Sequence, residues 1–125
     1  MDNRIKVFTF TRSRPQATQA DILAAQSKLD DYCRENVYCV VGSAFTKEPS
    51  SQLAAVMNDI IADMQSKGAE LLVVPDISRL GRHYPDVLGI AEQFAAAGIE
   101  IETVDDGCRL TDVLEQDDDP FVQGM

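Results

Sequence analysis

The spacing of apolar residues divides the chain into alternating strands and helices. Short segments of β-favouring residues, either alternating with polar ones or forming one unbroken apolar run, predict four strands at residues 5–10, 37–45, 71–74 and 99–104. Longer segments with apolar residues three and four positions apart predict three helices at residues 21–36, 49–67 and 85–97. The resulting order is strand, helix, strand, helix, strand, helix, strand.

Each predicted helix has one apolar face that must pack against something. In the first helix this face consists of Ile22, Ala25, Leu29, Tyr32 and Cys33. In the second it consists of Leu53, Val56, Met57, Ile60, Ile61 and Met64, and in the third of Val87, Leu88, Ala91, Phe94 and Ala95. Gly68 and Gly98 follow the last apolar positions and end the second and third helices. The unbroken apolar run 71–74 is typical of a strand that is covered on both faces.

Strands that alternate with helices predict right-handed crossovers and a mainly parallel sheet. We therefore expect an α/β fold with three layers, in which helices flank a four-stranded sheet on both faces. The chain has 125 residues, which suits one domain with one real core. We place that domain at residues 1–107 and treat residues 108–125 as an acidic C-terminal tail.

Charge is the most restrictive feature of the composition. The chain carries 11 Lys and Arg against 21 Asp and Glu, a formal net charge of −10. Residues 104–125 hold seven acids and Arg109, which gives −6, so the first 103 residues hold the remaining −4. Nucleic-acid binders gain most of their non-specific affinity from basic side chains that neutralise phosphates. We therefore do not expect this chain to bind DNA by itself. The acidic tail is either a solvated end or an interaction segment, which could also cover a basic crevice as a mimic of phosphate.

The remaining composition indicates a cytoplasmic protein. There is no apolar run long enough to span a membrane and no apolar leader at the start of the chain, so we expect neither membrane insertion nor secretion. Three cysteines, Cys33, Cys39 and Cys108, are an odd number and are interpreted as reduced thiols. Cys33 and Cys39 are expected to be buried as small apolar groups.

Basic side chains follow two of the predicted strands. Arg12 and Arg14 follow the first, and Arg79, Arg82 and His83 follow the third. Ligands of open parallel sheets bind beyond the carboxyl ends of the strands. If these two strands are neighbours, Arg12, Arg14, Arg79 and Arg82 form an anion-binding site, because guanidinium groups match phosphate oxygens in pairs. The equally open alternative is that these arginines form ion pairs with nearby acids such as Asp76 and Asp86.

No cofactor or metal is predicted. His83 is the only histidine, which rules out a histidine metal cluster and a Ser-His triad. Cys33 and Cys39 lack the close spacing of a zinc site. The chain has no glycine-rich phosphate loop of the Walker or dinucleotide kind.

The segment around the second arginine pair resembles a known family. Leu71-Leu72-Val73-Val74, followed by Ser78-Arg79-Leu80-Gly81-Arg82, is similar to the signature of serine site-specific recombinases, the resolvases and invertases, in which an apolar strand leads into Asp-Arg-Leu-x-Arg. The following helix, Gly98 and the last strand are similar as well. The resemblance covers about residues 4 to 107 and implies the resolvase fold.

The resemblance also marks departures from the family's chemistry. The family's first strand ends in Tyr-x-Arg-x-Ser, and counting back from Gln16 and Gln26 places Phe8, Phe10 and Arg12 at those three positions. The serine of the family attacks a DNA phosphodiester, and arginines stabilise the charge that develops on phosphorus. Arg12 stays protonated and cannot act as a nucleophile. Ser78 replaces the family's Asp, and residues 45–53 have no counterpart of its Ser-Gly and Arg-Pro segment.

Two serines could replace the missing nucleophile. Ser13 lies one residue from the aligned position, but a shift of one residue turns a side chain to the opposite face of a strand. Ser78 lies beside Arg79, but nothing in the sequence supplies a base for it. If the domain is active, its catalytic residues are therefore Ser13, Arg79 and Arg82.

The sequence favours a resolvase-like domain of DNA recombination that is catalytically inactive and acts as an interaction or regulatory module. We expect a protein partner or a homodimer, because the nucleophile, one arginine and the Asp are missing while the fold signature remains. The 18 residues after Gly107 are acidic, so we do not expect this chain to contact DNA as the family does. Two alternatives stay open. One is an active phosphoryl-transfer enzyme of the DNA strand-exchange type that uses Ser13, and the other is a module that binds a small anion or a nucleotide.

Overall fold

A computed structural model describes residues 4–13, 16–47, 52–76, 80, 84–105 and 108–109. The strands are β1 (Lys6–Arg12), β2 (Cys39–Thr46), β3 (Leu71–Val74), β4 (Glu100–Thr103) and β5 (Cys108–Arg109). The helices are α1 (Gln19–Glu35), α2 (Leu53–Lys67) and α3 (Tyr84–Ala96). All seven predicted elements are present, and the first strand extends two residues further than expected.

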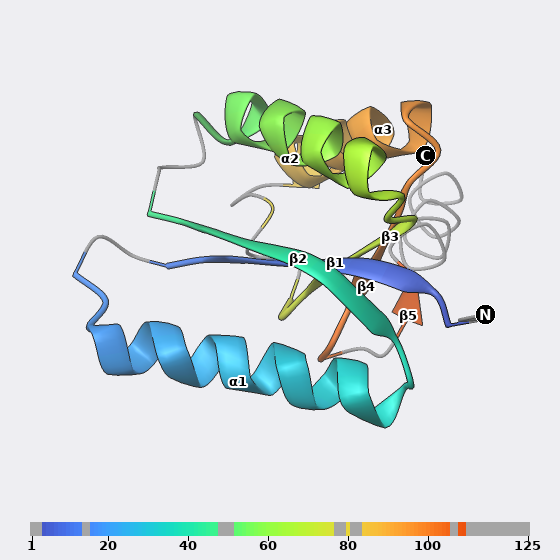
Figure 1. Ribbon diagram of the computed structural model, residues 1–125. Coiled ribbons are helices and arrows are strands. Elements are labelled where there is room, and N and C mark those ends of the chain that lie inside the picture. The colour runs from blue at the N-terminus through green and yellow to red at the C-terminus, as the bar shows by residue number, and fades with distance from the viewer. Residues whose placement is uncertain are drawn as a thin grey trace, which may run out of the picture.

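The strands form one sheet in the order β2-β1-β3-β4-β5. β1, β2, β3 and β4 run parallel, whereas the two-residue β5 pairs antiparallel with β4. α1 covers one face of this sheet, and α2 and α3 cover the other (Figure 1). The predicted three-layer α/β fold with four mainly parallel strands is therefore confirmed. β5 adds a short strand within the segment that the sequence assigned to the tail.

Local signals explain where α1 begins and where α2 ends. Thr18 and Asp21 form a capping box, in which the Asp21 backbone N–H donates to Thr18 Oγ1 and the Thr18 N–H donates to Asp21 Oδ2. α2 ends at Gly68, whose φ of +73° is the left-handed conformation that glycine adopts without steric cost. These ends fix the lengths of the crossovers between the parallel strands.

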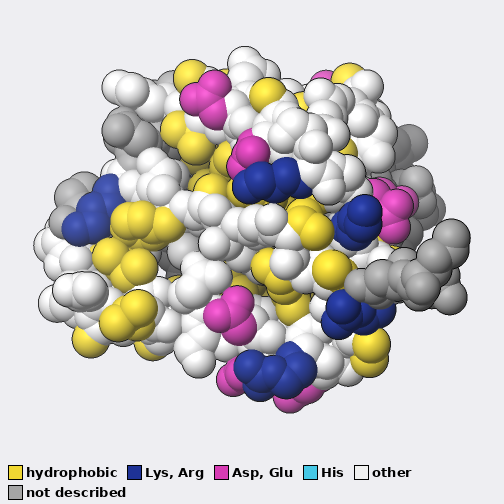
Figure 2. Space-filling model, viewed as in Figure 1, with side chains coloured by type: hydrophobic (Ala, Val, Ile, Leu, Met, Phe, Trp, Pro, Cys, Tyr) yellow, Lys and Arg dark blue, Asp and Glu magenta, His cyan; other side chains and the backbone are white. Residues whose placement is uncertain are grey.

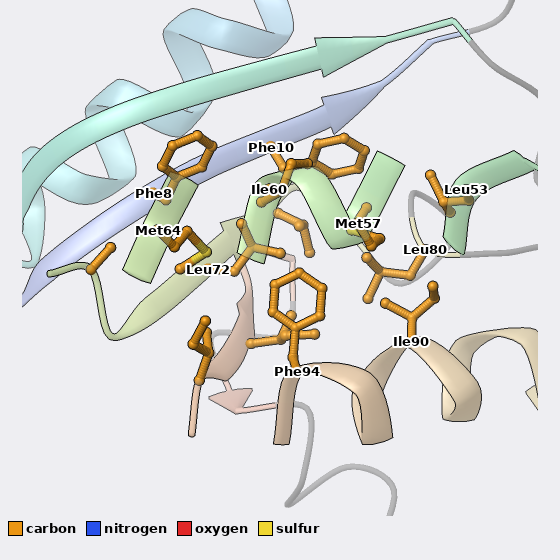
Figure 3. Packing of buried hydrophobic residues seen from close by; sticks show 14 of the residues in the cluster. Phe8, Phe10, Leu53, Met57, Ile60, Met64, Leu72, Leu80, Ile90 and Phe94 are labelled. Atoms are coloured by element: carbon orange, nitrogen blue, oxygen red, sulfur yellow. The ribbon is translucent and has the colours of Figure 1, made fainter. Parts of the chain in front are cut away.

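The larger core lies between the sheet and the two helices α2 and α3. It consists of fifteen buried residues of the described chain, among them Phe8, Phe10, Leu53, Met57, Leu72, Leu80 and Phe94 (Figure 3). The predicted inward face of α3 is confirmed for Val87 and Phe94. It is wrong for Ala95, which is exposed, because at 100° per residue Ile90 takes the inward position instead.

The smaller core lies between the sheet and α1. Its buried residues are Val7, Leu29, Cys33, Leu71 and Val73. The predicted burial of thiols is confirmed for Cys33, whereas Cys39 is half-buried because it begins β2 at the edge of the sheet. The face of the sheet beneath α2 and α3 therefore buries more apolar side chains than the face beneath α1.

Candidate functional site

The carboxyl ends of β1 and β3 lie side by side, as the proposed anion site requires. Val7, Phe8 and Thr9 of β1 pair in parallel with Leu71, Leu72 and Val73 of β3. Of the predicted site residues, Arg12 and Ser13 are described at this end of the sheet. Arg14, Ser78, Arg79, Arg82 and His83 lie outside the described residues.

The two faces of β1 differ in chemistry up to its last residue. Phe8 and Phe10 point into the core beneath α2, and Phe10 is fully buried there (Figure 3). The two-residue period of a strand places Arg12 on that same side, where it is half-buried at the end of β1. The position that resembles the family's arginine therefore holds a core aromatic ring. The position that resembles its nucleophile holds a guanidinium, which can bind an anion but cannot attack phosphorus.

Ser13 follows Arg12, the last residue of β1. Its backbone N–H donates to the carbonyl oxygen of Thr46 at 3.0 Å, at the end of the pairing with β2. Continued alternation of side chains would put Ser13 on the face of Thr9 and Thr11, opposite to Arg12. β1 itself has no extra residue between Phe8 and Arg12.

One residue of the second arginine segment is described. Leu80, which lies between Arg79 and Arg82 in the sequence, is fully buried and packs in the core with Leu53 and Met57. Figure 3 shows it close to Met57. Leu80 itself therefore lies on the α2 and α3 side of the sheet, which is also the side of Arg12.

The face of β1 beneath α1 is polar, a feature that the sequence analysis missed. Thr9 Oγ1 accepts a hydrogen bond of 3.4 Å from Gln26 Nε2 on α1. Thr11 is buried, and its hydroxyl has no hydrogen-bond partner among the described residues. The signal for this row is the alternation of Phe8, Thr9, Phe10 and Thr11 in the sequence, in which both threonines fall on one face.

A second polar cluster joins α1 to β4. Glu102 of β4 is only 5% exposed, and its carboxylate accepts hydrogen bonds from the Tyr32 and Tyr38 hydroxyls, with Tyr38 at 2.9 and 3.1 Å. Burial, together with the Glu102 hydrogen bond and charge, raises the pKa of Tyr32 well above its usual range. Hydrophobic spacing assigns Tyr32 to the apolar face of its helix. Spacing alone does not show that its phenol hydroxyl contacts a buried carboxylate.

The thiol of Cys33, next to this cluster, is buried in a place that favours its protonated form. Burial, and then the charges of Asp30 and Glu102, raise the pKa of Cys33 from 9.0 to about 11. A thiol with a raised pKa carries little of the thiolate that acts as a nucleophile or metal ligand. No group of three His, Cys, Asp or Glu side chains within the described ranges could hold a metal ion.

An open pocket of about 500 Å³ lies along α1 and reaches Val104, next to the carboxyl end of β3. Its lining includes Ser27, Lys28, Asp31, Tyr32, Glu35 and Val104. Lys28 forms an ion pair of 3.1 Å with Asp105 at its rim, and both side chains are largely exposed. The described lining therefore combines one base, Lys28, with two acids, Asp31 and Glu35, and does not favour an anionic ligand.

Comparisons with solved structures show which class of protein has this fold. A resolvase family site-specific recombinase from Streptococcus pneumoniae aligns with a TM-score of 0.73 and 22% identity, over 97% of this chain and 90% of that one. The N-terminal catalytic domain of TP901-1 integrase aligns with a TM-score of 0.70 and 18% identity, over 85% and 82% of the two chains. The C-terminal catalytic domain of ISC1926 TnpA, an IS607-like serine recombinase, aligns with a TM-score of 0.66 and 17% identity, over 80% and 70%. The fold is therefore that of serine recombinase catalytic domains.

A comparison of the sequence with known families identifies the family of the chain. The family described as the resolvase N-terminal domain matches residues 12–124, so the chain belongs to this family of DNA recombination domains. The match begins at Arg12, so Phe8 and Phe10 precede it. A search of curated proteins finds no match. No helix in the described part of the chain is both long and apolar enough to cross a membrane.

Proposed function

We propose that this resolvase-family domain does not cleave DNA and acts in recombination through contacts with other proteins. The observation that carries the proposal is the side chain pattern of β1 on the α2 side. Phe10 is fully buried in the core and Arg12 follows it, where the resemblance to the family places an arginine and the attacking serine. Neither side chain can form a covalent link to phosphorus.

The geometry of Ser13 further supports the loss of cleavage. Its backbone continues the pairing with Thr46, so the strand period directs its side chain away from the side of Arg12 and Leu80. A nucleophile has to lie on the same side as the groups that stabilise the transition state. Free thiols at Cys33 and Cys39 are in keeping with a location in the cytoplasm, which we include in the proposal.

The test is a search for a covalent protein–DNA intermediate. Supercoiled plasmids that carry candidate recombination sites are incubated with the full chain, quenched in detergent and analysed for phosphoserine-linked protein. An active serine recombinase on its own site is the positive control. We expect no adduct with the natural sequence or with Ser13→Ala. An adduct that disappears in Ser13→Ala and persists in Ser78→Ala would instead establish the strand-exchange enzyme.

A second candidate function is the binding of a small anion without chemistry. It is favoured by Leu80, which lies between Arg79 and Arg82 in the sequence and is itself buried on the side of Arg12. Inorganic phosphate or a nucleotide would then raise the melting temperature, and Arg79→Ala would remove the effect. Ligand at 100 times its Kd stabilises a protein by about 2.7 kcal/mol, which a thermal melt resolves. Lys28→Ala is the matched control, because Lys28 pairs with Asp105 beneath α1.

A further inference from the structure

The two edges of the sheet differ in length. β5 closes one edge with two residues, whereas β2 runs along the other edge for eight. Its outer side borders no other strand in the described parts of the chain. A long edge strand presents backbone N–H and C=O groups to any further strand, and proteins usually block such edges with charges, prolines or short strands. β2 has no charged residue and no proline in its sequence CVVGSAFT.

The absence of charge extends beyond the strand. Residues 36–46 form the longest stretch of the sequence without Asp, Glu, Lys or Arg, in a chain of net charge −10. Figure 2 shows white and yellow atoms over the middle of β2, with charged side chains arranged around them. Two copies of so acidic a chain repel each other over most of their surface. The strand β2 itself brings no charged side chain into such a contact, and Lys67 Nζ, which lies beside Gly42, is paired with Asp63 at 3.2 Å.

A bulge arranges the apolar side chains of this edge. Val40 and Phe45 are 42% and 40% exposed. Five positions apart in a regular strand, they would lie on opposite faces. The extra residue between the pairs Val7↔Val40 and Phe8↔Gly42 corrects this difference, and Val40 and Phe45 pair with Val7 and Thr11 of β1, which both face α1. The two exposed side chains therefore share one face of the sheet.

This arrangement is complementary to itself. In an antiparallel pair of two β2 strands centred on Ser43, Val40 of each copy lies opposite Phe45 of the other. The contact of a β-branched with an aromatic side chain, which stabilises neighbouring strands, thus occurs twice. Inside these pairs the bulged residues Val41 and Gly42 of each copy together lie opposite Ala44 of the other, and Ser43 lies opposite Ser43. The bulge at Val41 lies near the centre and leaves the outer pairs in register.

We propose that the outer edge of β2 is a homodimer interface, in which a second copy of this chain adds its β2 antiparallel about a two-fold axis through Ser43. The two sheets become one continuous sheet, with both copies of α1 on the same face. A strand of another protein would need its own matching order of side chains, which β2 already provides for itself. The inference is independent of whether the domain cleaves DNA.

The test measures the mass of the full chain in solution over a dilution series, by analytical ultracentrifugation. We expect a reversible dimer. Val40→Lys or Phe45→Lys raises its Kd by roughly tenfold or more, because each change removes two cross-strand pairs and places charges on the edge. Leu23→Lys, at an equally apolar and exposed position on α1, leaves the Kd unchanged. Thermal melts of each variant establish that it is folded.

Cross-linking locates the contact independently of stability. The double variant Val40→Cys with Phe45→Cys should form a covalent dimer on oxidation, because residues directly opposite in an antiparallel pair have Cβ atoms about 5 Å apart. Leu23→Cys should not form one in the same time. A natural chain that stays monomeric at all concentrations overturns the proposal. So does a dimer that persists unchanged in folded Val40→Lys and Phe45→Lys variants.

Discussion

The two faces of the sheet bury different kinds of side chain, although the same strands supply both. Towards α2 and α3 the described residues form one apolar cluster of fifteen buried side chains, beside which Thr103 is buried as a polar residue. Towards α1 the cluster has five, and it is accompanied by buried polar groups on β1 and β4, namely Thr9, Thr11 and Glu102. The face beneath α2 and α3 therefore provides most of the hydrophobic stabilisation, and the face beneath α1 depends on satisfying its polar groups.

This difference bears on the proposed loss of DNA cleavage, because Phe10 and Arg12 lie on the face that buries most of the residues that stabilise the fold. The end of β1 on the α2 side is occupied by Phe10, which belongs to the apolar cluster, and then by Arg12. A polar catalytic group at position 10 would have to replace part of the core. The substitution of this position is thus coupled to stability and not only to activity.

The largest effect is expected for Phe10→Arg, which would restore the residue that the family resemblance implies. A guanidinium placed in the apolar cluster is desolvated without a described partner, and we expect a loss of more than about 4 kcal/mol. Such a loss is most of the stability of many domains. Urea denaturation followed by circular dichroism measures it. Phe10→Leu is the control, and a folded Phe10→Arg protein of natural stability would show that the two faces are not as different as described.

The next effect concerns the polar face. Tyr38→Phe removes one of the two tyrosine hydroxyls that donate to the buried Glu102 carboxylate. We expect a loss of about 2 kcal/mol in the free energy of unfolding, because the hydrogen bond is charge-assisted and the carboxylate stays buried. Ser66→Ala removes an exposed hydroxyl from α2, on the other face, where Ser66 Oγ donates to the Asp63 carbonyl oxygen, and serves as the comparison. Equal effects of the two substitutions would contradict a special role of the Glu102 cluster.

The pH dependence of stability should also arise beneath α1. The Cys33 pKa rises from 9.0 to about 11 on folding, so the folded state binds the thiol proton more tightly than the unfolded chain. Its contribution is complete below pH 9.0 and is lost as the pH rises towards 11, with a slope of roughly 1 kcal/mol per pH unit. Tyr32, whose pKa is also raised, adds to the loss at higher pH.

Denaturation at a series of alkaline pH values tests this expectation. Cys33→Val should flatten the pH profile above pH 9.0, whereas Cys39→Ser at the half-buried start of β2 should leave its shape unchanged. A profile of the same steepness in the Cys33→Val variant would show that the alkaline transition has another origin.

Hydrophobic spacing predicted the architecture well, because each element buries a face with its own period. Strand 71–74 is found with the predicted bounds, and β1 and β3 are neighbours as the anion site requires. Spacing could not show the burial of Glu102, because the alternation in residues 99–104 only assigns it to the face opposite Ile101. Whether that face meets solvent or two tyrosines depends on residues seventy positions away in the sequence.

The same limit applies to the edge of β2 and to the candidate site. The bulge at Val41 changes which side chains share a face. An isolated glycine inside a strand, here Gly42, suggests a bulge or a close approach, but it does not show which residue is extra or which side chains then share a face. At the site, the sequence identified Arg12 and Ser13 by resemblance. Their assignment to opposite faces required the backbone pairing of Ser13 with Thr46.

The smallest effect has the opposite sign, and it compares two adjacent residues of β1. Phe10 faces the apolar cluster, whereas the hydroxyl of the buried Thr11 has no hydrogen-bond partner among the described residues. Thr11→Val replaces that hydroxyl by a methyl group of similar shape, which removes the cost of burying it. We expect a gain of about 1 kcal/mol, measured as a higher urea midpoint with an unchanged slope. Thr9→Val is the matched control on the same face, because Thr9 accepts a hydrogen bond from Gln26 and should gain less or lose stability. A loss on Thr11→Val as large as that on Thr9→Val would mean that the Thr11 hydroxyl has a partner in solution, and the polar row beneath α1 would then be fully satisfied.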